Sequence, residues 1–83
     1  MNSGYFTLTN GQYRYSIYCN KNDTVSTLIG KLKEFYSPQE NNELILIYGT
    51  TPIDRNARIS DYNIDYGRRI KFAEEYNGGL NIF

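Results

Sequence analysis

Few side chains in this sequence could carry out chemistry on a substrate. The chain has 83 residues, with no histidine and a single cysteine, Cys19. A histidine general base and the usual zinc sites are therefore excluded. Cys19 alternates in phase with Ile17 and has no basic neighbour to lower its pKa, which favours a small core residue over a nucleophile. We predict no catalytic residue, no metal site and no cofactor of the chain's own.

A second feature with chemical meaning lies near the end of the chain. Gly78-Gly79 is followed by four residues, Leu80, Asn81, Ile82 and Phe83. Glycine has no side chain and accepts extended or unusual backbone dihedrals. Taken alone, the pair is equally typical of a flexible tail.

Length and composition limit the kinds of protein that this sequence can form. Eighty-three residues allow one small domain, and a hydrophobic fraction of 40% is enough for a thin core. The nine basic and nine acidic residues give a formal net charge of zero, so nucleic acid is not an expected partner. No apolar run approaches the ~20 residues that span a bilayer, so we expect no membrane insertion. The first four residues lack the features of a secretory signal, and we expect a cytoplasmic monomer.

The hydrophobic pattern predicts the elements that position these groups. Alternation predicts strands over 5–9 and 12–19, joined by a hairpin turn at Asn10-Gly11. Helical spacing predicts a helix that begins at the N-cap Thr24 and ends before Ser37-Pro38. Its apolar stripe comprises Val25, Leu28, Ile29, Leu32, Phe35 and Tyr36.

The second half of the chain predicts fewer regular elements. Residues 43–48 form a continuous apolar strand, whose second face could bind a partner. Residues 68–72 form a last strand, and periodicity is lost from Glu74 onward. Gly30 within the helix predicts a close approach of helix to sheet. Together these elements predict a small α+β domain with one helix packed across one sheet face.

One short segment resembles a known family. Ser60 to Ile64 reads Ser-Asp-Tyr-Asn-Ile, which is identical to the matching segment of ubiquitin. Without a gap from that anchor, Gly78-Gly79 falls on ubiquitin's terminal Gly-Gly, and Leu46-Ile47-Tyr48 falls on Leu-Ile-Phe. With one residue fewer in the middle loop, Asp23-Thr24-Val25 matches the helix start. The chain thus resembles the ubiquitin-like proteins over most of its length, and the implied fold is the β-grasp with a mixed sheet.

The resemblance implies that the chain is the precursor of a protein modifier. Residues 1–77 would form the ubiquitin-like domain, 78–79 the conjugation motif, and 80–83 a tail removed by a protease. An activating enzyme that uses ATP and a conjugating enzyme would then join Gly79 to amines of target proteins. Two alternatives stay open: a binding or adaptor domain that is never conjugated, and a sulfur carrier with a terminal thiocarboxylate.

Departures from ubiquitin imply different partners. Glu75 stands where ubiquitin has the arginine that its activating enzyme reads, so a dedicated activating enzyme is expected. Thr51 and Tyr66 replace ubiquitin's two best-known linkage lysines, which argues against ubiquitin-type chains. The predicted partner-binding patch, by match to ubiquitin's docking surface, comprises Leu8, Ile45, Ile47, Lys71 and Ala73.

Overall fold

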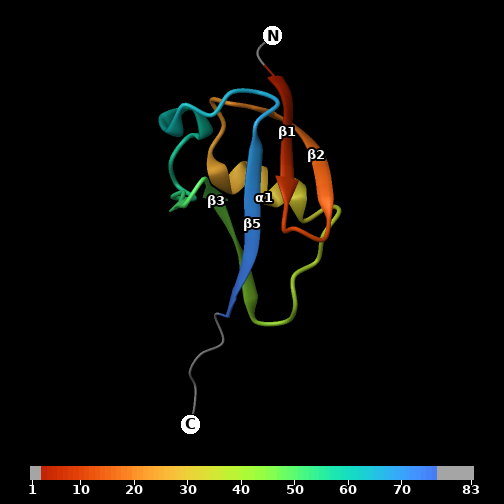
Figure 1. The fold of residues 1–83 in the computed structure, drawn as a ribbon. Helices are drawn as coiled ribbons and strands as arrows, with labels where there is room; N and C mark the ends of the chain where they lie inside the picture. The colour runs from red at the N-terminus through yellow and green to blue at the C-terminus, as the bar shows by residue number, and fades with distance from the viewer. Residues whose placement is uncertain (1–2, 77–83) are drawn as a thin grey trace.

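A computed structural model describes residues 3–76 of the chain. Its elements, in order, are β1 (Ser3–Thr9), β2 (Arg14–Asn20), α1 (Val25–Leu32), β3 (Asn42–Tyr48), β4 (Thr51–Pro52), the short 3₁₀ helix η1 (Ile59–Tyr62) and β5 (Arg69–Tyr76). The five strands form one sheet in the order β2-β1-β5-β3-β4. Strands β1 and β5 are parallel, and the other neighbours are antiparallel. Figure 1 shows α1 lying across one face of this sheet, which confirms the predicted α+β architecture.

The first hairpin turns at Asn10-Gly11, as the sequence predicts. The side-chain Oδ1 of Asn10 accepts hydrogen bonds from the backbone N–H groups of Gln12 at 2.9 Å and Tyr13 at 2.7 Å. Gly11 has a φ of +93°, a conformation that costs a residue with a Cβ more than it costs glycine. The turn therefore fixes the register in which β1 and β2 pair.

The helix begins where the sequence predicts and ends earlier. Thr24 is the N-cap, and its hydroxyl accepts a hydrogen bond from the Thr27 N–H at 3.2 Å. Helix α1 ends at Leu32, after which the Phe35 N–H bonds to the Leu32 carbonyl in a tight turn. The prediction that Phe35 belongs to the buried stripe is wrong, because Phe35 is 63% exposed. The helix ends before Phe35, and the tighter turn that follows, before Pro38, directs the Phe35 side chain away from the buried face.

The core lies between α1 and the inner sheet face. It consists entirely of apolar side chains and Cys19, with no buried polar residue among those described. Strands β1, β2, β3 and β5 contribute alternate residues to it, such as Phe6 and Leu8 from β1 and Ile70 and Phe72 from β5. Cys19 is 2% exposed, which confirms its prediction as a core residue. Within residues 3–76, no helix is long and apolar enough to cross a membrane.

Two glycines lie in opposite environments. A Cβ built on Gly4 in β1 would lie 2.6 Å from Cγ of the Tyr66 ring, so this ring packs directly on the strand backbone. The Tyr66 hydroxyl also accepts a hydrogen bond from the Lys21 N–H at 3.0 Å. A Cβ on Gly30 would meet nothing within 4 Å, so the predicted close approach at Gly30 is wrong. The tight contact between elements is at Gly4, where a loop side chain covers the sheet.

Candidate functional site: the end of β5 and the outer sheet face

The last strand is longer than the sequence predicts. Strand β5 continues through Glu74, Glu75 and Tyr76, where loss of periodicity was expected. These residues pair in register with β3, with Tyr76 opposite Asn42. The prediction of an irregular segment from Glu74 is therefore wrong for these three residues, because the partner strand supplies the backbone hydrogen bonds. The predicted conjugation and tail residues are outside the described part of the chain: Gly78, Gly79, Leu80, Asn81, Ile82 and Phe83.

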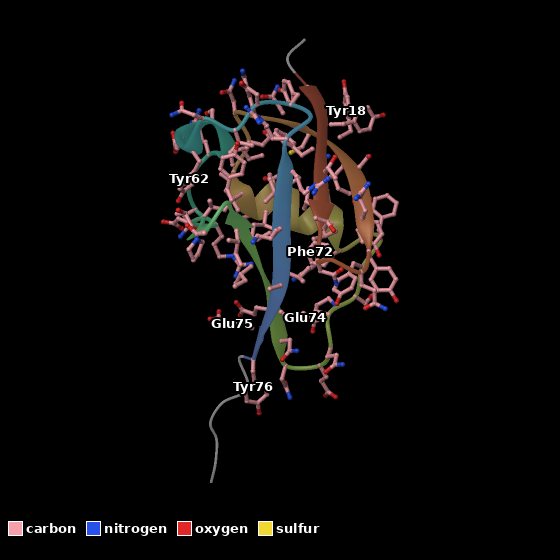
Figure 2. All side chains as sticks on the ribbon, viewed as in Figure 1. Tyr18, Tyr62, Phe72, Glu74, Glu75 and Tyr76 are labelled. Atoms are coloured by element: carbon pink, nitrogen blue, oxygen red, sulfur yellow. The ribbon has the colours of Figure 1, made fainter. Side chains whose placement is uncertain are left out.

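Glu74 fastens the end of β5 to the loop that follows the helix. Its side chain lies between β5 and the loop that follows α1 (Figure 2), where its Oε1 accepts hydrogen bonds from Asn42 Nδ2 at 2.8 Å and the Gln39 N–H at 2.9 Å. Its other oxygen, Oε2, accepts a hydrogen bond from the Tyr36 hydroxyl. The Asn42 amide, the Tyr36 hydroxyl and the Gln39 N–H hold the pKa of Glu74 below its ordinary value. The same carboxylate raises the pKa of Tyr36.

Glu75 has a different environment from its neighbour. Alternation places its side chain on the outer sheet face, where it is exposed and lies opposite Glu43 of β3. Glu43 Oε1 accepts a hydrogen bond from Arg55 Nη1 at 3.0 Å, and the two side chains form an ion pair. These three residues border a groove of about 200 Å³ at the β3 edge, whose apolar lining includes Ile29 and Ile53. This groove at the end of the sheet is thus apolar inside and bordered by charged side chains.

Four of the five residues predicted for the partner-binding patch lie together. Ile45 pairs with Ala73 and Ile47 pairs with Lys71 across β3 and β5, so all four side chains share the outer face. Ile45, Ile47 and Ala73 are half-buried, while Lys71 is exposed. This face is the one that α1 leaves uncovered (Figure 1), and whether a partner docks on it stays a prediction.

The fifth predicted patch residue does not reach this surface. Leu8 has 0% exposure and belongs to the core, so its inclusion in the patch is wrong. Strand β1 extends to Thr9, and its alternation turns Leu8 toward α1 rather than leaving it in the hairpin loop.

Sequence reasoning missed the roles of Glu43, Arg55 and Tyr36 around this site. Their contacts join residues 12 and 38 positions apart, which no local pattern reveals. The pairing register of β3 with β5 brings the three residues to one end of the sheet. Among residues 3–76, no group of three histidine, cysteine or acidic side chains is arranged to hold a metal ion.

Comparison with known proteins places this geometry in a known architecture. A de novo designed protein based on ubiquitin matches 96% of this chain and 98% of its own, with a TM-score of 0.80 and 20% identity. The chain has the ubiquitin-like β-grasp fold. The ubiquitin-like domain of Dsk2 from Plasmodium falciparum superimposes with a TM-score of 0.75 and 13% identity over 88% of this chain and 99% of its own.

Other comparisons limit what the ubiquitin-like fold establishes. A ubiquitin-like domain from Arabidopsis thaliana has a TM-score of 0.79 at 14% identity, covering 99% of this chain and 87% of its own. No family model matches the sequence, and no curated protein matches it. Identities this low establish the β-grasp fold and leave function to be argued from the residues.

Proposed function

We propose that this chain is the precursor of a ubiquitin-like protein modifier, and that it acts as a substrate of enzymes rather than as an enzyme. The observation that carries the proposal is the place of Gly78-Gly79 relative to the β-grasp sheet. The structure describes β5 as far as Tyr76, which pairs with Asn42, and Gly79 lies three positions further along the sequence. A fully extended chain of three residues spans about 10 Å, so an enzyme acting at Gly79 must also approach the end of β5.

The proposed chemistry uses the carboxyl group of Gly79. A protease hydrolyses the Gly79–Leu80 peptide bond with water and releases Leu80–Phe83. An activating enzyme joins the freed carboxylate to AMP from ATP, with release of pyrophosphate. A cysteine of the activating enzyme displaces AMP to form a thioester, and a cysteine of the conjugating enzyme takes over the acyl group by thiol exchange. A target amine then attacks this second thioester, which forms the amide and releases the cysteine thiol. Glycine suits these steps because it adds no side chain at the enzymes' active sites.

The charge at the end of β5 supports a dedicated set of enzymes. Glu75 is exposed on the outer face, beside the strip formed by Ile45, Ile47, Lys71 and Ala73. An activating enzyme that binds a basic residue at this position presents acidic groups, which would repel Glu75. The proposed activating enzyme therefore offers a cation to Glu75, and the proposed docking strip contacts the conjugating enzyme or protease.

Expression of an N-terminally tagged chain in its native host tests the proposal. Wild type should give species of higher mass on a denaturing gel. The intact mass of the unconjugated protein should equal that of a chain that ends at Gly79. Gly79→Ala should remove those species, while the matched control Asn77→Ala should retain them. A pool that keeps Leu80–Phe83 throughout would overturn the modifier proposal in favour of a binding domain. A chain ending at Gly79 with sulfur in place of one carboxyl oxygen would favour a sulfur carrier.

A further inference from the structure

One edge of the sheet is open along a whole strand. Strand β2 is outermost and pairs only with β1. The Asn10 N–H donates to the Tyr13 carbonyl at 3.2 Å, and hydrogen bonding alternates along an antiparallel pair. Odd-numbered residues of β2 therefore bond to β1. The backbone groups that point away from the sheet are the N–H and C=O groups of Arg14, Ser16 and Tyr18 and those of Asn20, whose carbonyl also accepts a hydrogen bond from the Asp23 N–H at 2.9 Å.

This edge lacks the features that usually prevent an edge strand from pairing with another chain. Strand β2 has seven residues, no proline and one charged residue, Arg14. At the opposite edge, β4 is only two residues long and includes Pro52. Native edge strands are commonly shortened or interrupted by charge and proline to prevent pairing with another chain. The open edge of β2 therefore fits a strand that pairs with another strand.

Exposed aromatic rings border the same edge. Tyr18 is 50% exposed, and it projects from the β2 side of the molecule (Figure 2). Tyr5 of β1 is 58% exposed, and its ring centroid lies 5.0 Å from that of Tyr18. On the helix side, Phe35 is 63% exposed. Large rings left in water beside open backbone groups indicate a surface that becomes covered.

A groove runs along the edge of β2 beside the helix, and its lining contains one cation and one anion. Its volume is about 320 Å³, and its lining includes Ile17, Lys31, Glu34 and Phe35. Within residues 3–76, neither Lys31 nor Glu34 forms an ion pair. Lys31 acts electrostatically on Cys19 at one end of β2, and the Phe35 ring lies 6.2 Å from the Tyr15 ring at the other. The helix thus places Lys31 toward the end of β2, and the turn after it places the segment Glu34-Phe35 nearer the beginning of β2.

We propose that β2 pairs antiparallel with β2 of a second copy of this chain, about a two-fold axis at Ile17. This register overlaps the full strand, because Ile17 is its central residue. Arg14 then lies opposite Asn20 of the second copy, and Ser16 lies opposite Tyr18. All four residues with outward-facing backbone groups pair with one another, and no like charges meet.

The helix charges match the same two-fold axis. Rotation about Ile17 brings the Cys19 end of one strand beside the Tyr15 end of the other. Lys31 of each copy therefore faces Glu34 and Phe35 of the other, which gives two complementary charge contacts per dimer. This surface is separate from the end of β5, so the dimer leaves the C-terminal end of each sheet accessible (Figure 1). The proposal replaces the monomer expected from the sequence and does not depend on the proposed function.

Sedimentation equilibrium of the full chain across a concentration range tests the proposal. The wild-type mass should rise from 9.7 kDa to twice that value. Lys31→Glu and Glu34→Lys should each weaken association by about tenfold or more, because like charges then meet at both contacts. The double variant Lys31→Glu with Glu34→Lys should restore the wild-type dimer, which a general loss of stability would not do.

A backbone variant tests strand pairing separately from charge. Ser16→Pro removes an outward-facing N–H and leaves the bonds to β1 in place, so it should give a folded monomer by circular dichroism and sedimentation. A wild-type chain that stays monomeric at NMR concentrations would overturn the proposal and leave the edge for a different partner. Failure of the double charge variant to restore association would also overturn it.

Discussion

At the scale of single residues, Cys19 gives stability a specific dependence on pH. Burial, and next the nearby Asp23 carboxylate, raise the pKa of its thiol from 9.0 to about 11. Between these values the folded chain holds a proton that the unfolded chain has lost. The folded state binds more protons, so stability must fall as pH rises above 9, by about 1 kcal/mol per pH unit from this group.

Urea unfolding of wild type and Cys19→Ala from pH 8 to pH 11 measures this contribution. Cys19→Ala should be less stable at pH 8, because it removes a buried sulfur atom, and the gap should shrink as pH rises. The two proteins differ only at position 19, so the contributions of all other side chains cancel in the comparison. A constant gap across this range would contradict the pKa assigned to Cys19.

At the scale of elements, Gly4 and Gly30 should respond oppositely to the same substitution. Gly4→Ala places a Cβ 2.6 Å from the Tyr66 ring, which must move and weaken its hydrogen bond to the Lys21 N–H. We expect a loss of roughly 1–3 kcal/mol in the free energy of unfolding. Gly30→Ala adds a methyl group to an exposed helix position with nothing within 4 Å, and should gain about 1 kcal/mol.

Thermal unfolding of the two variants provides the measurement, and each is the other's matched control. Equal effects of the two substitutions would contradict the contact between Tyr66 and the β1 backbone. A loss of stability in Gly30→Ala would instead mean that this helix face is covered in the folded protein.

At the scale of the whole molecule, two neighbouring residues of β3 lie on opposite faces of the sheet, one in the core and one on the outer face. Leu46 has 0% exposure beneath α1, whereas Ile47 is half-buried on the outer face. Leu46→Ala should cost about 2–5 kcal/mol in the free energy of unfolding, because it leaves a cavity. Ile47→Ala should cost about 1 kcal/mol, because Ile47 is only half-buried. It should also weaken transfer from the conjugating enzyme, which the proposed docking strip contacts.

Urea unfolding and a transfer assay with purified enzymes distinguish the two effects. Lys71→Ala serves as a second outer-face variant, since it removes the exposed partner of Ile47 without opening a cavity. Loss of stability without loss of transfer in both outer-face variants would contradict the docking strip.

Local patterns predicted much of the fold. Asn10-Gly11 indicated the first turn, Thr24 indicated the helix start, and alternation separated Ile17 and Cys19 from Tyr18. These features depend on neighbours within a few positions, where turn, capping and periodicity rules act. The resemblance carried by Ser60 to Ile64 led to the same β-grasp architecture that the structure has.

Contacts between distant segments decided the rest. Pairing with β3 kept Glu74 and Glu75 within β5 and turned them to opposite faces, one held by Tyr36 and the other exposed. Packing in the core between α1 and the sheet buried Leu8, which sequence matching had placed at the surface. By itself, the sequence determined the kinds of element and their order, because those follow from local chemistry. Only the tertiary structure decided register, strand length and exposure, because these depend on which partner supplies the hydrogen bonds and covers the side chains.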